Sequence, residues 1–68
     1  MNNYFRQYVF STFNNEILAV VNAYSPIFAA IKISKIIQQK EFTFTHTLSK
    51  NKFTATNDGA FIKIYPTN

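Results

Sequence analysis

The segment NAYSPIFAAIKIS (residues 22–34) decides the fold, because the spacing of its apolar residues changes at Ser25 and Pro26. Before these two residues apolar side chains alternate with others, as in a strand, and after them they recur at helical spacing. Ser is able to cap the unpaired N–H groups of a first helical turn, and Pro is preorganised for the first helical position. The sequence therefore predicts a helix over residues 26–39.

The predicted helix has two different faces on a helical wheel of about 100° per residue. One face is free of charge and consists of Ala29, Ala30, Ile33, Ile36 and Ile37. The opposite face consists of Phe28, Ile31, Lys32, Lys35, Gln38 and Gln39. We expect the uncharged face to pack on a sheet, where its two alanines let the helix backbone approach the strands closely.

Two strands are predicted before the helix, over residues 4–13 and 16–24. Aromatic and β-branched residues favour strands, and they are frequent in the first of these segments. Asn14 and Asn15 separate the segments, and Asn tolerates the positive φ that a tight hairpin turn requires. We therefore expect the two strands to pair as an antiparallel hairpin.

Three further strands are predicted after the helix, over residues 41–48, 52–56 and 60–65. The first of them alternates aromatic or apolar residues with threonines, the period of a half-buried strand. Polar turns separate the three, and the turn at residues 57–59 places the single glycine where a positive φ is needed. We expect Pro66 to end the last strand.

This order of elements predicts an α+β fold, ββαβββ, in which one helix packs on one face of an antiparallel sheet as a two-layer sandwich. The chain has 68 residues and forms one domain, residues 1–68, because two cores would leave each half below the roughly 40 residues that fold unaided. It has no cysteine, so its stability depends on apolar packing, for which eight Phe and four Tyr provide large surfaces.

Polar residues assign the two faces of the second and the last strand. The helix covers one face of the sheet, and the other is the open face. In the second strand, Glu16 and Asn22 mark the open face. The residues left for the helix side are Ile17, Ala19, Val21 and Ala23. In the last strand, Lys63 places on the same open face Phe61 and Tyr65, and on the helix side Ile62 and Ile64. Residues on the open face are expected to meet solvent or a partner.

The first strand is ambiguous, since both of its residue sets are apolar. If Phe5, Val9 and Phe13 point inward, the open face gathers many aromatic side chains. It then carries Tyr4, Arg6, Tyr8, Phe10, Leu18, Val20, Tyr24, Phe61, Lys63 and Tyr65. Such a face could bury itself in a homodimer, contact another protein, stack nucleic-acid bases or remain a plain surface.

Few residues are able to support catalysis. The chain has one His, two Glu, one Asp and no Cys, and no metal-ligand spacing or glycine-rich phosphate loop is present. We expect a non-enzymatic protein without metal or cofactor, in which His46 has a packing or edge role. The longest apolar runs have five residues, against about 18 for a membrane span, so no membrane location is expected.

The charge distribution indicates a partner-binding face on the helix. The net charge is +4, and all six lysines follow residue 31. The residues predicted to bind a partner are Phe28, Ile31, Lys32, Lys35 and Gln38, for which the alternative is a solvated helix face. A secondary set on the open sheet face is Arg6, Tyr8, Phe61, Lys63 and Tyr65. Basic and apolar groups together suit a protein surface or a phosphate backbone.

Two stretches resemble a family of small phage proteins. Residues 22–29 resemble a strand-to-helix junction of the form Ala-x-Ser with an Ala four residues after the Ser, and residues 53–63 resemble the closing hairpin of the same proteins. The family is that of anti-CRISPR inhibitors of type I-F surveillance complexes, which share the ββαβββ order. In that family the helix supplies basic contacts, and Lys35 aligns with one of them. Where the family has two successive basic residues one turn earlier, this chain has Ala30 and Ile31.

The resemblance implies inhibition by steric occupation in the cytoplasm of an infected bacterium. The partner would be a CRISPR surveillance complex, bound along the protein subunits that hold its guide RNA, and target DNA would lose access. Two alternatives stay open. One is a nucleic-acid-binding module that uses Lys50, Lys52, Lys63 and the open sheet, and the other is a structural phage protein that dimerises through that sheet.

Overall fold

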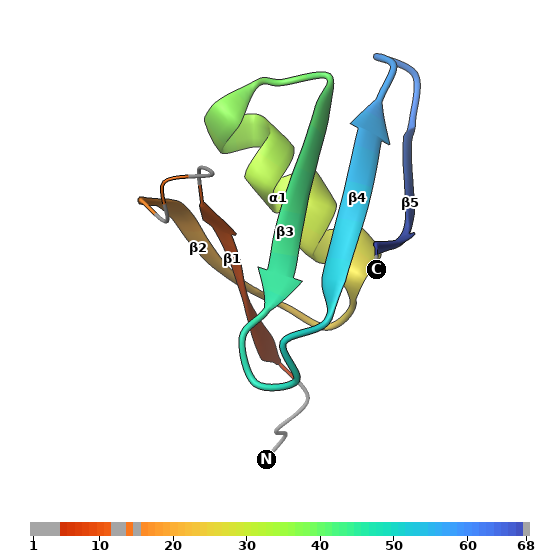
Figure 1. Cartoon of the computed structure of the whole chain (residues 1–68). Coiled ribbons are helices and arrows are strands. Elements are labelled where there is room, and N and C mark those ends of the chain that lie inside the picture. Colours follow the sequence, from red (N-terminus) through yellow and green to blue (C-terminus); the bar gives the residue numbers. More distant parts are fainter. Residues whose placement is uncertain (1–4, 12–13, 15, 68) are drawn as a thin grey trace.

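A computed structural model of the chain describes residues 5–11, 14 and 16–67 (Figure 1). Its elements, in order along the chain, are β1 (Arg6–Ser11), β2 (Ile17–Ala23), α1 (Pro26–Ile37), β3 (Glu41–His46), β4 (Lys52–Asn57) and β5 (Ile62–Thr67). The predicted ββαβββ order is therefore confirmed.

The five strands form one antiparallel sheet in the order β2-β1-β3-β4-β5. Figure 1 shows α1 lying across one face of this sheet, behind β3 and β4 in the view. The helix contacts the two edge strands, β2 and β5, more extensively than the strands between them. The α+β two-layer architecture predicted from the sequence is confirmed, and we call the uncovered side the open sheet face.

β1 faces the opposite way from the arrangement that would make the open face aromatic. Tyr8 is only 2% exposed and Phe10 is also buried, whereas Val9 lies on the other side of the strand. Both buried rings meet aromatic side chains of β3: Tyr8 packs edge-on against Phe44, and Phe10 against Phe42. Because these rings fill the space under the helix, the predicted aromatic open face is wrong for β1. Tyr4 and Phe13 lie outside the described residues.

A bulge changes the facing of β2 at its start. Phe10 pairs with Ala19, but Ser11 pairs with Ile17, so Leu18 is an extra residue in the ladder. Alternation is lost at such a bulge. Ile17, predicted on the helix side, is therefore exposed. Beyond the bulge the prediction is confirmed, since three alternate residues of β2 are buried: Ala19, Val21 and Ala23.

α1 begins at Pro26 as predicted, but the Ser25 hydroxyl forms no capping hydrogen bond. The Ser25 backbone carbonyl instead accepts the first helical bond, from the Ala29 N–H at 3.0 Å. The buried residues of the helix are Ala29, Ala30 and Ile33. Ile36, predicted to be buried with them, is 55% exposed.

The exposure of Ile36 has a geometric cause. The half-buried residues Ile27 and Ser34 flank the buried face on the side of Ala30. Ile36 lies about 120° from Ala30 and about 20° outside Ala29, so it is at the opposite border of that face and in the last turn of the helix. The buried face is rotated relative to the predicted one, toward β5.

Several element ends differ from the predicted ones. α1 ends at Ile37, because Gln38 adopts a left-handed conformation (φ 54°) and its N–H bonds the Ser34 carbonyl at 3.1 Å. β3 ends at His46, where the following residues turn. Pro66 does not end β5 but lies within it, paired with Phe53, as Pro can on an edge strand.

Candidate functional site

Exposed aromatic and basic side chains gather where the end of β2 meets the first turns of α1. Phe5 and Tyr24 lie opposite each other across the hairpin and stack with ring centroids 4.3 Å apart. Phe28, in the first turn of α1, is 52% exposed. Lys32 and Lys35 follow on the helix, and both are exposed. We call these five residues the aromatic–basic surface.

Lys32 ties the helix to the edge of the sheet. Its ammonium donates to the backbone carbonyl of Asn22, with Nζ and O 2.5 Å apart. The same Nζ lies 5.5 Å from the centroid of the Phe5 ring, a cation–π distance. These contacts hold the lysine over the Phe5 ring and fix its charge in place.

A shallow hollow of about 330 Å³ lies within this surface, and the aromatic–basic residues together with Ala23 and Ile31 line it. Among the residues that the structure describes, none of those lining the hollow is acidic. The hollow therefore offers apolar walls and two positive charges to a partner.

The structure brings together most of the helix residues predicted to bind a partner. Phe28, Lys32 and Lys35 share one exposed region, while Ile31 is half-buried. Gln38 is exposed but caps the far end of α1, away from the hollow. The sequence prediction missed Phe5 and Tyr24 as part of this region. The two-residue turn expected from Asn14 and Asn15 would pair Phe5 with Tyr24, so this contact could have been predicted from the hairpin.

The secondary predicted set does not form one site. Lys63 and Tyr65 are on the open sheet face, paired with Thr56 and Thr54. Arg6 and Tyr8 point to the helix side of β1, in register with Ala23 and Val21, so their assignment to the open face is wrong.

The open sheet face is lined largely by threonine across β3, β4 and β5. Thr54 is buried there, and its hydroxyl lies within hydrogen-bonding distance of the hydroxyls of Thr43 and Thr67. Phe61 borders this face, with the Lys63 ammonium 5.5 Å from its ring centroid. The face is therefore a polar threonine surface with an aromatic and basic margin at β5, and it is not an aromatic platform.

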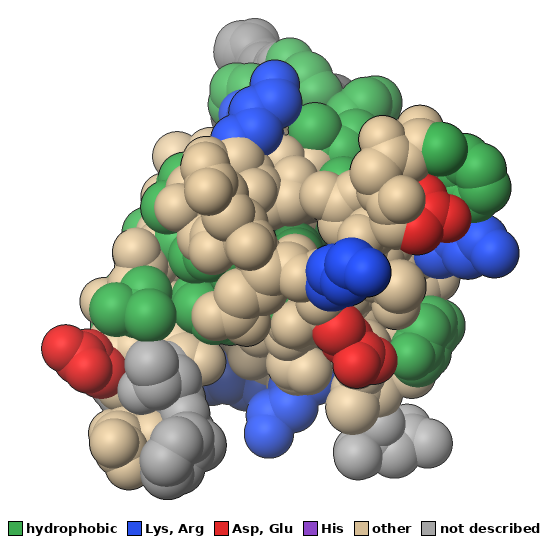
Figure 2. Space-filling model, turned by 90° about the horizontal axis from the view of Figure 1, so that it is seen from above, with side chains coloured by type: hydrophobic (Ala, Val, Ile, Leu, Met, Phe, Trp, Pro, Cys, Tyr) green, Lys and Arg blue, Asp and Glu red, His purple; other side chains and the backbone are tan. Residues whose placement is uncertain are grey.

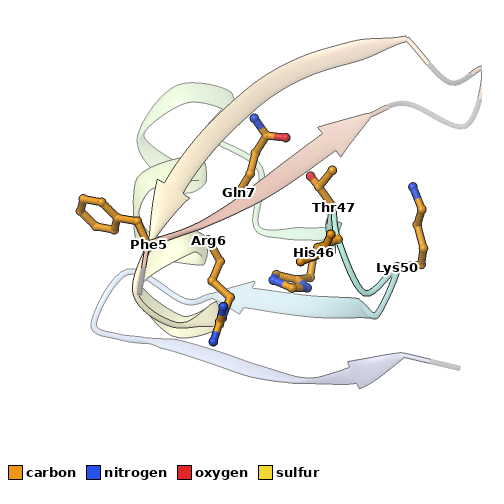
Figure 3. A pocket seen from close by; sticks show the side chains of 7 residues that line it. Phe5, Arg6, Gln7, His46, Thr47 and Lys50 are labelled. Carbon is orange, nitrogen blue, oxygen red and sulfur yellow. The ribbon is translucent and has the colours of Figure 1, made fainter. Parts of the chain in front are cut away.

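A second hollow, of about 590 Å³, lies between the start of β1 and the β3–β4 turn. Figure 3 shows Arg6 and His46 on one side of the β1 ribbon, and Gln7 on the other. The Lys50 side chain points away from Arg6 in the same view. The two cationic groups that line this hollow, those of Arg6 and Lys50, therefore do not converge on one ligand position.

His46 is held by its own turn. Its Nδ1 accepts the Ser49 N–H at 3.2 Å and lies 2.5 Å from the Ser49 hydroxyl, and its ring packs 5.0 Å from that of Tyr8. Burial raises the pKa of the Tyr8 phenol above its ordinary value, and the charge of Arg6 opposes this. These contacts agree with the packing role predicted for His46.

Charged groups on the described surface are dispersed. Viewed from above, basic side chains are spread over the surface, some of them next to acidic ones, and the acidic ones are apart from each other (Figure 2). Among the described residues, no group of three His, Asp or Glu side chains is placed to hold a metal ion. In the same residues, no helix has the length and apolar character needed to cross a membrane.

Comparisons with known proteins give no relative: no family model, no curated protein and no solved structure matches the chain.

Proposed function

We propose that this chain is a small inhibitory binding protein of anti-CRISPR type, which occupies a protein surface of a CRISPR surveillance complex through its aromatic–basic surface. The observation that carries the proposal is the stacked pair Phe5–Tyr24 beside the exposed Phe28 and two lysines. The resemblance of residues 22–29 to the type I-F inhibitors suggests the partner, and the same residues form the junction on which this surface is built.

The chemistry of the surface suits a protein partner with an acidic border. Aromatic residues provide large contact areas at a low cost in side-chain entropy and are enriched among binding hot spots. Lys32 is already fixed over Phe5, so little freedom is lost when a carboxylate approaches it. Inhibition then requires only that the chain occupies a surface that target DNA must cross, and it requires no chemical reaction.

Plaque formation by phage on cells with an active type I-F system tests the proposal. Expression of the chain is expected to restore plaques, and the purified chain should capture the surveillance complex. Phe28→Ala is expected to weaken capture at least about tenfold, as for a hot-spot aromatic. Lys32→Glu with Lys35→Glu should abolish it, while the free energy of unfolding changes by about 0.5 kcal/mol per site.

A charge-matched control distinguishes an effect of this surface from an effect of the change in net charge. Lys50→Glu with Lys52→Glu makes the same change in charge at exposed positions around the β3–β4 turn. This control should capture the complex as the parent does. Absence of any plaque rescue by the parent chain would refute the inhibitory function. Rescue that is equal for both double variants would refute the site.

The alternative is nucleic-acid binding by the open sheet face. It is favoured by the placement of Lys52, Lys63 and Tyr65 on that one face, next to the exposed Phe61. A gel shift distinguishes the two functions, because counterion release makes nucleic-acid binding fall steeply with salt. A shift that Lys63→Glu removes, and that Lys35→Glu leaves intact, would support the alternative.

A further inference from the structure

The outer edge of β2 leaves unpaired backbone groups that can be assigned residue by residue. The Thr47 N–H bonds the Gln7 carbonyl at 3.0 Å, so the backbone groups of Gln7 point from β1 toward β3. Its partner in β2, Asn22, is therefore in a non-hydrogen-bonded pair. The backbone N–H and C=O of Asn22 must then point outward, and those of Val20, two residues earlier, point the same way.

The lysine contact confirms this direction. Lys32 reaches the Asn22 carbonyl from the helix, which is feasible only if that carbonyl points away from β1. Lys32 thus covers one end of the edge, and the bulge at Leu18 disturbs the other. Val20 lies between them, and no strand of the described chain lies beyond β2 to pair with it.

The two edges of the sheet differ in their protection. β5 carries Pro66, which has no N–H, and Lys63, two features that discourage the addition of another strand. β2 itself has neither a proline nor a charged residue, so its protection is confined to its two ends, by Lys32 and by the bulge, and it exposes Leu18 and Val20 on the open sheet face. An uncharged edge with exposed apolar side chains is a template for strand pairing.

We propose that a second copy of this chain pairs with the β2 edge, antiparallel and about a two-fold axis at Val20. In this register Val20 of each copy exchanges both backbone hydrogen bonds with Val20 of the other, while Lys32 keeps its bond to Asn22. Two five-stranded sheets become one continuous sheet. The exposed Val20 side chains then lie side by side on its open face.

Charge complementarity favours a second copy over another strand. Glu16 immediately precedes β2, and Lys32 lies over its carboxyl end. Antiparallel pairing about Val20 places Glu16 of one copy opposite Tyr24 of the other, close to the Asn22 carbonyl that holds Lys32. Opposite charges therefore face each other at both ends of the interface, although each chain has a net charge of +4.

Sedimentation of the purified chain over a concentration series tests the pairing. A few strand hydrogen bonds make a small interface, so we expect a dimer with a dissociation constant on the order of 100 µM. Val20→Lys places two like charges side by side and should weaken the dimer at least about tenfold. The matched control is Tyr65→Lys, since Tyr65 and Val20 are each 50% exposed on the open face of an edge strand. It should dimerise as the parent does.

Amide hydrogen exchange of the parent chain gives an independent measurement. The N–H group of Val20 should exchange more slowly as concentration rises, while that of Val21, which already faces β1, should not change. A chain that stays monomeric at about 1 mM, or a dimer that Val20→Lys leaves unchanged, would overturn the proposal. Loss of the dimer in Tyr65→Lys alone would also overturn it, by placing the contact at β5.

Discussion

Asp58 shows how one exposed side chain organises the β4–β5 turn. Its Oδ1 accepts the N–H groups of Ala60 at 3.0 Å and of Phe61 at 3.1 Å, and the neighbouring Asn57 side chain accepts the N–H of Gly59. These bonds favour the ionised carboxylate, so the Phe61 and Ala60 N–H groups hold the pKa of Asp58 below its ordinary value of 3.8. The turn that positions Phe61 therefore depends on an ionised carboxyl group.

This pKa shift predicts a loss of stability in acid. The pKa is lower in the folded chain than in the unfolded chain, so the unfolded chain binds more protons as the pH falls below about 4. The contribution of Asp58 is complete above the unfolded pKa and is lost as the pH falls through the folded pKa. Asp58→Asn keeps an acceptor oxygen but does not titrate. Urea unfolding at about pH 7 and about pH 3 should show a smaller acid loss for this variant than for the parent.

Asp58→Ala serves as the second variant in that comparison. It removes the acceptor as well as the charge, so it should already be less stable than Asp58→Asn at about pH 7. An acid loss in Asp58→Asn as large as that of the parent would mean that this carboxylate does not contribute to the pH dependence.

Single residues were predictable where the sequence marked a face with a polar group. Lys63 correctly placed Ile62 and Ile64 toward the helix, and both pack against the core. β1 has polar residues on both of its faces, Arg6 on one and Gln7 on the other, and its central residues are all apolar, so polarity does not mark its facing. Which side of β1 faces the helix is decided by the packing of Tyr8 and Phe10 against aromatic residues of β3 under the helix, and not by alternation alone.

At the scale of elements, α1 ends in a conformation that its sequence does not favour. Gln38 has φ 54°, in the left-handed region, where a side chain is costly and glycine is preferred. No glycine follows the helix to signal this end, which explains why the predicted helix ran two residues too far. Lys35, in the last turn, places a positive charge where the helix dipole favours one.

Gln38→Gly is therefore expected to stabilise the chain. Relief of the left-handed strain should raise the free energy of unfolding by about 0.5–1 kcal/mol, measured by urea denaturation. Gln39→Gly is the control, because Gln39 is exposed and, among the described residues, is not one with positive φ. A gain from Gln39→Gly equal to that from Gln38→Gly would show that helix-end geometry is not the cause.

The number and order of elements were predictable because each one has its own period and its own turn. The bulge at Leu18 was not, since both hairpin strands are apolar there and alternation fits more than one register. Only part of the aromatic–basic surface could be predicted from the sequence, for a similar reason. Phe28, Lys32 and Lys35 follow from helical spacing, whereas Phe5 joins them only through the hairpin register.

At the scale of the whole molecule, stability depends on close contact between one helix and five strands. Ala29, Ala30 and Ala55 are each fully buried, so the two layers approach with only small side chains between them at these positions. The larger side chains Ile33 and Phe44, also fully buried, fill the remaining space. A layer contact of this kind has no room for a longer side chain.

Ala29→Lys should be severely destabilising, because an unpaired ammonium buried against strands costs several kcal/mol, a large part of the roughly 5 kcal/mol that a domain of this size possesses. Ile36→Lys introduces the same side chain on the same helix, at a position that is 55% exposed, and should change the free energy of unfolding by only about 0.5 kcal/mol. Thermal melting followed by circular dichroism compares the two. If Ala29→Lys melts with the parent, the buried face assigned to α1 is wrong. If Ile36→Lys destabilises the chain as much as Ala29→Lys does, Ile36 is buried as the sequence predicted, and the rotation of the buried face toward β5 is incorrect.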